Sequence, residues 1–594
     1  MSSSPDSLVA NQSPIRQRTG VVLDLLAVAA VVSAALAAYW HATGYYFSQD
    51  DFTFLARAKG IQPYPGLFDP FGTRVISARL FFLSMHGLFG LEAGPYHWAS
   101  LLLHALNAAL VYAVARCWTG SKLVALVSGL LFAASDIAFT AVFWISGVQD
   151  LLATTFLLLA ALIWSARPSR GWMVAALSAV AMALSLLSKS VGVLFPAVLF
   201  LMARARPGRG RRTIVLLAPH AAISLGALAL LLAQSSGVRE GGAYEAGITA
   251  ALPHNLATYV AWTADVIHPF KDRVAMIDFD AWKRALPIGV VLALFMFTSR
   301  GKQARMQWGA LGWYFLCIAP VLPLLRHTYL YYIYPAMPGA AILAGLAVYR
   351  MASALSRRFG SLGLKIGWAT GLGAAAVLCA IGISNVRARE NARLEPDFTL
   401  PHDHVLRSSV LAENAASTFA ESGIPRGVDL LLINPYSPLS SDLAKGVDPE
   451  AKRATFDMVR AALRGGSVLR LLRPDLGDIE FAQNMRREWE NRHALVYDGF
   501  GRLTYIGTGA DIWANLSTFY LSHMKRIDES MSCSKRALEL NPDQPRANLN
   551  LGAALVMTGS PEEARVYLQR ALETSPIPGI REDARKWLRR LEQE

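Results

Sequence analysis

The sequence predicts a polytopic α-helical membrane protein that ends in a small α/β module and a set of helical repeats. Of its 594 residues, 53% are hydrophobic and only 17% are charged, which lies outside the usual range of soluble globular chains. Long apolar runs recur through residues 21–386, and charge rises only after them. The expected organisation is an N-terminal cytoplasmic tail (1–20), a membrane domain (21–386), an α/β module (397–508) and a repeat region (511–594).

The apolar runs are long enough, or nearly so, to cross a bilayer, which needs about 20 residues of helix. The first run is too long for a removable signal peptide and lacks a small-residue cleavage site, so we expect it to stay as an anchor. A further stretch, 253–270, is either another span or an interfacial helix. Roughly eleven spans are expected, at residues 21–40, 98–115, 123–143, 151–166, 171–188, 190–203, 213–234, 285–298, 306–325, 331–349 and 366–385.

The loops between these runs predict an orientation. One alternating set of loops is rich in Lys and Arg and nearly free of acids, and such loops stay on the cytoplasmic side. The other set holds the acidic side chains and should lie outside, as should the C-terminal part; in a bacterium this is the periplasmic side of the inner membrane. The net charge of +14 is then mostly a topology signal, which argues against a nucleic-acid partner.

Beyond the membrane domain, the pattern changes to that of a small α/β module. The stretches "GVDLLLINP" (427–435) and "SVLRLLRP" (467–474) predict short buried strands. Between them, "DPEAKRATFDMVRAALRGG" (448–466) predicts an amphipathic helix that ends at Gly.

The last part of the chain contains an internal repeat. An Ala-Leu pair at 537–538 recurs at 571–572, and Pro542 recurs as Pro576, a spacing of 34 residues (571 − 537). This is the period of tetratricopeptide repeats, and the signal is stronger for the second repeat than for the first, at about 511–542. Because two repeats bury little by themselves, we expect them to lean on the preceding module or on a protein partner.

Two adjacent carboxylates, Asp50 and Asp51, lie among five aromatic residues in "GYYFSQDDFTFLARAKG" (44–60), just after the first span. A solvated loop is the simplest interpretation, but adjacent carboxylates repel each other and the aromatic residues favour burial near the lipid interface. A carboxylate placed in this way can act as a general base on an acceptor hydroxyl or amine. Its neighbour can orient it or hold a divalent cation.

The residues that follow this pair carry a resemblance to a known family. They include "YHWASLLLHALNAALVYAVAR", "WISGVQDLLATTFLLLAAL" and "LSLLSKSVGVLFPAVLFL". Together with the acidic pair and the C-terminal repeats, this arrangement resembles the GT-C glycosyltransferases. It is most similar to the branch that includes protein O-mannosyltransferases and the transmembrane-and-tetratricopeptide-repeat mannosyltransferases. The resemblance covers roughly residues 20–385 and is most specific over 45–200.

The resemblance implies an activity. It implies transfer of one sugar from a polyprenyl-phosphate carrier in the membrane lipid to an acceptor protein, lipid or glycan on the outer face, usually with inversion at the anomeric carbon. In this resemblance Asp50 takes the place of the catalytic base, and Asp51 stands where many members have Glu or a second Asp. A second acidic site, on the acceptor or metal side, would fall on Asp136 or Asp150. For Asp150, an interaction with a helix dipole is the alternative explanation. Asp136, inside an apolar stretch, is harder to explain structurally.

Cations on the outer side are candidates for binding the carrier's phosphate. Lys189, Arg326 and His327 lie in or beside outer connections, and Arg74 follows the acidic pair in the first outer loop. Snorkelling to the interface is the alternative for Lys189 and Arg326. Arg326 would suit bidentate phosphate binding, and Lys189 would act as a point charge. The resemblance adds Tyr329 and Tyr332 as weaker candidates for contacts with the sugar or carrier.

The chain also departs from the family pattern. The region "ASDIAFTAVFW" lacks the His-Pro and Thr-Glu residues of the mannosyltransferase branch, and no DxD triplet is present. The identity of the sugar therefore stays open, as does the use of a divalent cation such as Mg²⁺ or Mn²⁺ as cofactor.

Two other classes of protein are kept as alternatives. A transporter would show intramembrane charges and inverted repeats. A non-catalytic assembly protein would use the tetratricopeptide repeats but would have no need of an acidic pair with matching cations.

Overall fold

The computed structural model describes residues 14–69, 71–165, 171–205, 211–235, 244–269, 281–394, 400–434, 458–482 and 485–593. Its contacts divide the chain into two compact units. The first unit comprises Met1–Tyr45 and Arg57–Leu406, and the second comprises Tyr46–Ala56 and Arg407–Glu594. The segment that carries Asp50 and Asp51 thus groups with the C-terminal part of the chain.

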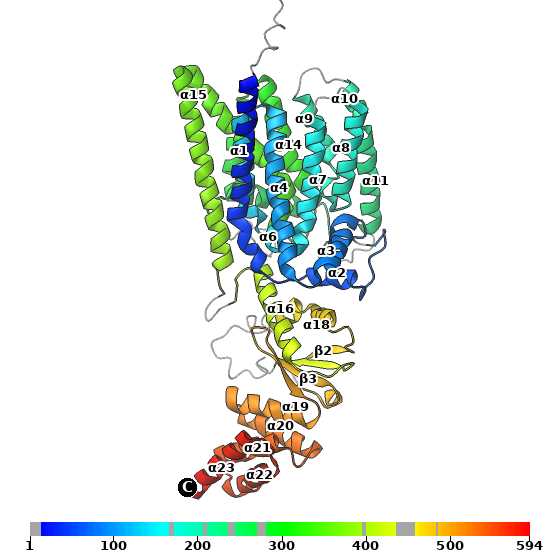
Figure 1. The fold of residues 1–594 in the computed structure, drawn as a ribbon, viewed down its shortest axis with the longest axis vertical. Helices are drawn as coiled ribbons and strands as arrows, with labels where there is room; N and C mark the ends of the chain where they lie inside the picture. The colour runs from blue at the N-terminus through cyan, green and yellow to red at the C-terminus, as the bar shows by residue number, and fades with distance from the viewer. Residues whose placement is uncertain are drawn as a thin grey trace, which may run out of the picture. The chain divides into compact units, whose positions relative to one another are not determined.

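The first unit is a bundle of helices that run alongside one another (Figure 1). Its longer helices are α1 Pro14–Tyr39, α4 Ala93–Thr119, α5 Lys122–Ala133, α7 Val148–Ser165, α8 Gly171–Leu186, α9 Phe195–Arg204, α11 Ala218–Ser235, α12 Ala251–Ala264, α13 Ala281–Phe297, α14 Gly301–Ile318 and α15 Met337–Asn391. Shorter segments connect them: η2 Trp40–Gly44, η3 Val75–Leu80, α3 Phe81–Phe89, η4 Asp136–Ala138, α6 Phe139–Phe143, η5 Ile145–Gly147, η6 Ser190–Gly192, α10 Arg211–Leu216, η7 Ala319–Val321 and η8 Leu330–Ala336.

Length and composition mark this bundle as membrane-embedded. In the described part of the chain, four helical segments are long and apolar enough to cross a membrane, or five if one bent pair counts as a span. The four are Gly20–Gly44, Ala93–Thr119, Ile145–Ser165 and Leu330–Asn391. Large apolar side chains such as Leu25, Val291 and Phe297 are exposed, as lipid-facing residues are. The chain is therefore an integral membrane protein, as predicted, and the number of roughly eleven spans stays a prediction.

The helix α15 is a hairpin rather than one rod. Phe359 and Gly360 have non-helical backbone angles, and Gly360 has a φ of 58°. After the turn the chain folds back, so that a Cβ on Gly367 would lie 2.4 Å from the Cα of Ala352. Small residues allow this close approach of two helices in a membrane, where packing replaces the hydrophobic effect. Sequence analysis expected two separate spans here, at 331–349 and 366–385, and the break at Phe359 lies between them.

A bend interrupts the third predicted span. Lys122–Ala133 and Asp136–Phe143 meet at an angle of 44°. Asp136 begins η4 at this bend and is 7% exposed. The break explains how a carboxylate can lie within an otherwise apolar run, because the backbone there leaves the regular helix.

The second unit contains a small mixed sheet. Its strands are β1 Leu430–Ile433, β2 Ile479–Ala482, β3 His493–Tyr497 and β4 Leu503–Gly507. Their order is β2-β1-β3-β4; β1 is parallel to both neighbours, and β3 pairs with β4 in antiparallel fashion. The second unit also contains η9 Arg464–Gly466, α18 Ser467–Leu472 and η10 Arg487–Trp489, together with the larger parts of α2 Asp51–Ala58 and α16 His404–Glu421.

One of the two strand predictions in this module is wrong. Leu430–Ile433 is a strand and is fully buried, as predicted, but Ser467–Leu472 is the helix α18. The run "SVLRLL" buries Val468, Leu469 and Leu471, a set that suits a buried helical turn as well as a strand. Gly466, at a φ of 95°, directly precedes the helix. Residues up to 457 of the helix expected at 448–466 lie outside the described residues.

The C-terminal helices form antiparallel pairs of the expected kind, shown in orange and red in Figure 1. They are α19 Ala510–Thr518, η11 Phe519–His523, α20 Ile527–Leu540, α21 Pro545–Met557, α22 Pro561–Thr574 and α23 Pro578–Gln593. Small buried residues lie where helices cross: a Cβ on Gly552 would lie 2.6 Å from Leu568 Cγ. The fold class of a helical membrane domain followed by a small α/β module and helical repeats is confirmed.

Candidate functional site

The acidic pair lies at the start of the helix α2 in the second unit. Upstream of it, the backbone N–H of Tyr46 donates to Ser409 Oγ at 2.9 Å, and the Ser409 hydroxyl donates to the Tyr46 carbonyl at 3.0 Å. Phe47 and Phe52 are buried at 0% and 2% exposure. Burial raises the pKa of Tyr46 to about 12, with the Glu413 charge adding to the effect, so this phenol stays neutral. The segment is therefore anchored to Ser409 of α16 by hydrogen bonds, and its aromatic side chains contact one another.

Asp51 is buried, and its carboxylate bonds to the backbone. Its side chain is 1% exposed, and its Oδ2 accepts the backbone N–H of Ser48 at 2.8 Å. Its own N–H donates to the Ser48 carbonyl at 3.1 Å, which closes a turn before α2. A Ser followed three residues later by an acid is a known signature of an acidic side chain that accepts the backbone N–H of that Ser, as Asp51 does here. The sequence "SQDD" carried this signal, and sequence analysis missed it.

Asp50 has a different environment. Its side chain is 44% exposed, and its Oδ1 lies 2.8 Å from Nη2 of Arg464. The same Nη2 donates to Thr53 Oγ1 at 3.3 Å. Of the two carboxylates, Asp50 is thus the more exposed one. Sequence analysis did not find Arg464, because nothing local marks a partner so distant along the chain.

The two carboxylates do not fit a divalent cation held between them. Asp51 is buried and bonded to backbone, whereas Asp50 is half-exposed and paired with a guanidinium. A Mg²⁺ or Ca²⁺ site needs several oxygen ligands that converge on one point. The described residues contain no group of three or more His, Cys, Asp or Glu side chains that could hold a metal ion.

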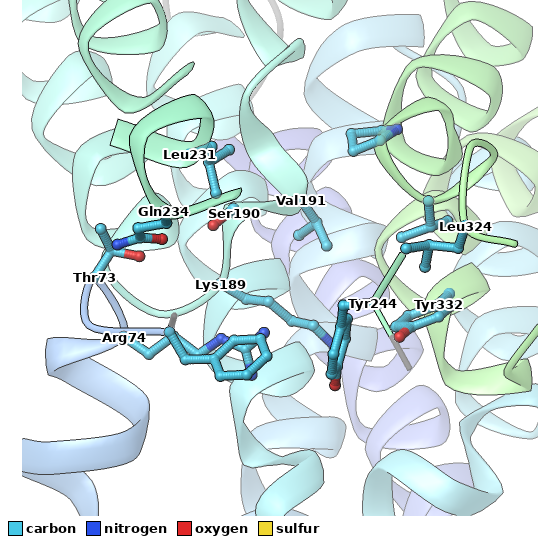
Figure 2. A pocket seen from close by; sticks show the side chains of 13 residues that line it. Thr73, Arg74, Lys189, Ser190, Val191, Leu231, Gln234, Tyr244, Leu324 and Tyr332 are labelled. Atoms are coloured by element: carbon cyan, nitrogen blue, oxygen red, sulfur yellow. The ribbon is translucent and has the colours of Figure 1, made fainter. Parts of the chain in front are cut away.

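The second candidate region is a cavity of about 230 Å³ within the first unit (Figure 2). It is lined by Phe71, Thr73, Arg74, Lys189, Ser190, Val191, Leu231, Gln234, Tyr244, Pro320, Val321, Leu324 and Tyr332. Figure 2 shows Lys189 extending toward Tyr244, with Arg74 on one side of it and Tyr332 on the other. Two cations and several apolar side chains, among them Val191, Leu231 and Leu324, therefore line the same cavity.

Lys189 and Asp150 form a buried ion pair beside this cavity. The Lys189 Nζ lies 2.7 Å from both carboxylate oxygens of Asp150, and their side chains are only 10% and 2% exposed. The ammonium also lies 4.8 Å from the Tyr331 ring centroid and 5.1 Å from that of Tyr332. Asp150, at the start of α7, thus serves a cation and not only a helix dipole.

Arg74 supplies the second positive charge. Its Nη1 donates to Gln149 Oε1 at 2.7 Å, and its guanidinium lies 4.3 Å from the Phe71 ring centroid. Two bonds hold the chain after Arg74 against the loop that precedes Lys189: Ile76 N–H donates to Leu187 O at 3.0 Å, and Ser77 Oγ donates to Ser188 O at 2.6 Å. With two cations and one carboxylate, this part of the cavity carries a net charge of +1 (2 − 1).

Aromatic side chains lie close to Lys189. His327 Nε2 and the Tyr332 hydroxyl share a hydrogen bond of 3.0 Å, and both residues are buried. The Tyr329 ring stacks on that of Tyr331 with centroids 5.2 Å apart. Tyr332 lines the cavity, whereas His327 and Tyr329 are not among its lining residues and contact Tyr332. Gln149, Tyr244 and Tyr331 belong to the same region and were not singled out by sequence analysis.

Two predicted residues lie elsewhere in the first unit. Arg326 has a side chain that is 55% exposed and pairs with Glu245 at 2.8 Å, and it is not among the described residues that line the cavity. Asp136 lines a separate cavity of about 190 Å³, and its Oδ2 accepts from Asn385 Nδ2 at 3.3 Å. The structure therefore brings together Arg74, Asp150, Lys189 and Tyr332, with His327 and Tyr329 next to them.

Comparisons with known proteins give one family match and several distant structural similarities. The tetratricopeptide repeat model matches residues 510–544, the first of the two repeats. No curated protein matches the chain.

Among solved structures, ArnT from Cupriavidus metallidurans bound to undecaprenyl phosphate is 14% identical, with a TM-score of 0.42 over 81% of this chain and 93% of that one. Oligosaccharyltransferase AglB from Archaeoglobus fulgidus, in complex with an inhibitory peptide and a dolichol-phosphate, is 13% identical, with a TM-score of 0.42 over 71% and 63%. Arabinofuranosyltransferase AftD from Mycobacteria is 17% identical, with a TM-score of 0.37 over 70% and 31%. The chain spans less than two thirds of AglB and AftD. Similarities of this size assign neither fold nor activity, so the function depends on this chain's own residues.

Proposed function

We propose that this protein is a membrane glycosyltransferase of the GT-C type, which moves a sugar from a polyprenyl-phosphate carrier to an acceptor on the outer face of the membrane. One observation carries the proposal. In the membrane unit, a small cavity is lined by two cations, Arg74 and Lys189, and by apolar side chains such as Leu231. An amphipathic ligand with an anionic head and an isoprenoid tail would contact both kinds of side chain.

The size of the cavity limits how much of a lipid carrier it can hold. At about 230 Å³ it is smaller than the roughly 300–1,000 Å³ of typical small-molecule sites. It suits a phosphate with part of a sugar, while a long isoprenoid chain must continue along the membrane-facing surface. The helix α11 lines the cavity with Leu231 and Gln234 and exposes Leu228 and Leu232 beside it, so an apolar chain can follow that helix.

The charges define how the donor would be held. Because Asp150 offsets Lys189, Arg74 is the cation whose charge an incoming phosphate would balance. Arg74 can form charge-assisted hydrogen bonds to phosphate oxygens, and Lys189 adds a fixed point charge. Both would stabilise the negative charge that the phosphate gains as the anomeric C–O bond breaks.

We assign the role of general base in this reaction to Asp50, as the family resemblance implies. It takes the proton of the acceptor hydroxyl or amine as the acceptor oxygen or nitrogen bonds to the anomeric carbon. The electron pair of the broken C–O bond stays on the carrier phosphate, and attack from the opposite face inverts the anomeric centre. The sugar and the acceptor class are not specified by these residues.

The direct test is a transfer assay. Purified protein in detergent or liposomes is incubated with radiolabelled polyprenyl-phosphate sugars and a membrane extract that supplies acceptors, in parallel with Mg²⁺, Mn²⁺ or EDTA. We expect loss of lipid-linked label and its appearance in an acceptor. Movement of intact lipid-linked sugar across a liposome membrane would indicate a transporter, and unchanged label with every donor would favour a non-catalytic assembly protein.

The location of the reaction is part of the proposal. We place the chain in the bacterial inner membrane with the C-terminal module and repeats in the periplasm, because the Lys- and Arg-rich loops define the cytoplasmic side. A periplasmically active reporter fused after residue 391, and another fused after 593, should both be active. Activity of cytoplasmic reporters alone would overturn both the orientation and the outer-face reaction.

A further inference from the structure

The contact between Asp50 and Arg464 lies within the second unit and joins two segments far apart in sequence. Asp50 Oδ1 lies 2.8 Å from Arg464 Nη2, and this nitrogen also donates to Thr53 Oγ1 on the same helix. Arg464 begins η9, directly before the helix α18 of the α/β module. One side chain of the module therefore contacts both the carboxylate and the first turn of α2.

The backbone on both sides of this pair is constrained. In the described part of the chain, only four non-glycine residues have a positive φ, and two of them are Gln49 and Arg464, both at 49°. A side chain with a Cβ rarely adopts this left-handed conformation, and such outliers gather at functional sites when the surrounding structure enforces them. Gln49 directly precedes Asp50. Arg464 itself, and the residue directly before Asp50, are thus held in a left-handed backbone conformation.

The segment around Asp50 is also fixed to the module upstream. Ser409 of α16 makes two hydrogen bonds to the backbone of Tyr46, at 2.9 and 3.0 Å, and Phe47 and Phe52 are buried. The residues Tyr46–Ala56 group with the C-terminal unit for this reason. A loop that sequence analysis assigned to the membrane domain is structurally a part of the extramembrane module.

We propose that Arg464 is a positioning residue for Asp50, so that the α/β module holds the carboxylate that acts as the base. This inference rests on the proposed function, in which Asp50 accepts the acceptor's proton. With Oδ1 held by the guanidinium, Oδ2 has a defined direction from which to accept that proton. A general base must lie within hydrogen-bond reach of its proton, about 2.6–3.2 Å, so a freely rotating carboxylate would be a poor base. The module is then a component of the catalytic machinery and not only a support for the repeats.

A double-mutant cycle tests this role. Arg464→Ala should lower kcat roughly 10- to 100-fold, the effect of a misplacement of about 1 Å, with the KM for the lipid donor unchanged. Arg464→Lys should restore most of the rate. In an Asp50→Asn background, Arg464→Ala should cost less than about twofold more, because a residue that acts through Asp50 has nothing left to position.

Arg470 provides a matched control. It is an arginine of α18 with a side chain 44% exposed, similar to the 40% of Arg464, and it donates to the Gly477 carbonyl rather than to α2. Arg470→Ala should leave kcat within about twofold of wild type, as surface substitutions usually do. Equal losses in the two arginine variants, or fully additive losses of Arg464→Ala and Asp50→Asn, would overturn the positioning role.

Amide hydrogen exchange of residues 46–58 gives a readout that needs no activity. Arg464→Ala should speed exchange in this segment, and Arg470→Ala should not. If the wild-type protein transfers no sugar from any donor but this difference is found, the proposed function fails and the structural link stands. If the wild type is active and Arg464→Ala changes neither the rate nor the exchange, the inference fails alone.

Discussion

In the membrane unit, Lys189 and Asp150 pair at 2.7 Å with side chains only 10% and 2% exposed, whereas in the second unit Arg464 and Asp50 pair at 2.8 Å with 40% and 44% exposed. The two contacts are similar in length and differ in environment. An exposed ion pair contributes about 0–1 kcal/mol, because water screens it and both side chains lose freedom. A buried pair must first offset the cost of removing two charges from water.

This difference suggests what each pair is for. Neither pair is a strong source of stability, so each is better explained by what its cation or carboxylate does. A phosphate that must be held beside lipid needs a cation that is already dehydrated and kept in place, as Lys189 is by Asp150. A base that must meet an acceptor arriving from water needs access, as Asp50 has. The burial of the first pair is therefore consistent with the phosphate binding proposed for it, and the exposure of the second is consistent with the proton transfer proposed for Asp50.

The largest effect should come from the exposed pair. Asp50→Asn keeps the shape of the side chain and removes its basicity, so kcat should fall by about 10²- to 10⁴-fold while the donor still binds. Asp51→Asn should cost less activity, because Asp51 serves the turn at Ser48, and should instead lower thermal stability. The measurement is the initial rate of transfer in the labelled-donor assay, with folding checked by circular dichroism.

Two outcomes with the Asn variants would contradict the assignment of Asp50 as the base. If Asp51→Asn abolished transfer in a folded protein while Asp50→Asn did not, the roles would be exchanged. Full activity of the double Asn variant would leave the acidic pair without a catalytic role and remove the contrast between the two regions.

The next effect should come from the cavity. Arg74→Ala should raise the KM for the lipid donor by about 10- to 100-fold, since a hydrogen bond to a charged group contributes about 1.5–3 kcal/mol. The control is Arg326→Ala, which removes an exposed guanidinium paired with Glu245 outside the cavity and should change KM little. Donor-concentration curves for the two variants make the comparison.

Arg74 is a cleaner probe than Lys189. Lys189→Ala would leave Asp150 buried without its counter-ion, and breaking a buried pair in this way costs about 3–5 kcal/mol of stability. If Arg326→Ala raised the donor KM and Arg74→Ala did not, the phosphate would bind at the exposed arginine, as the sequence alone suggested, and the cavity would lose its assigned ligand.

The sequence predicted the parts of this protein whose signal is local. Hydrophobic runs identified the membrane unit, and the 34-residue spacing identified repeats that a family model matches at 510–544. A single short strand, Leu430–Ile433, could be found from its apolar run, but the same kind of run at Ser467–Leu472 forms a helix. Short apolar runs do not distinguish the two, because tertiary contacts decide.

Among the candidate residues, too, only those with a local signal could be predicted from the sequence. Lys189 stood out as an isolated charge between apolar runs, and the structure places it in a cavity with Arg74. The pairing of Lys189 with Asp150, and that of Asp50 with Arg464, joins distant parts of the chain and leaves no mark in either local sequence. The different environments of Asp50 and Asp51 were partly predictable from the spacing of Ser48 and Asp51. Sequence analysis considered the flanking aromatic residues and did not use this spacing.

The smallest predicted effect concerns a polar contact between the α/β module and the repeats. Glu490 follows η10, and its carboxylate accepts Arg536 Nε at 2.8 Å and Nη2 at 2.9 Å from α20, and Trp513 Nε1 at 2.8 Å from α19. The Arg536 hydrogen bonds, together with that from Trp513, hold the pKa of Glu490 below its ordinary value against the opposing effect of burial. A carboxyl whose pKa is lowered by folding adds stability that is fully present above its unfolded value of about 4.3. That stability is lost as the pH falls through the folded value.

Glu490→Gln should therefore lower the melting temperature of the full-length protein slightly at pH 7, and the difference from wild type should shrink as the pH falls below about 4. Thermal unfolding in detergent, followed by tryptophan fluorescence between pH 7 and pH 3, measures both. At the acidic end the wild-type side chain is protonated and resembles glutamine, so the two proteins should converge. A difference that stayed constant across this range would mean that the amide disturbs packing rather than charge. In that case the contact between the module and the repeats would depend on the apolar cluster that joins the sheet to α19 and α20, and not on this ion pair.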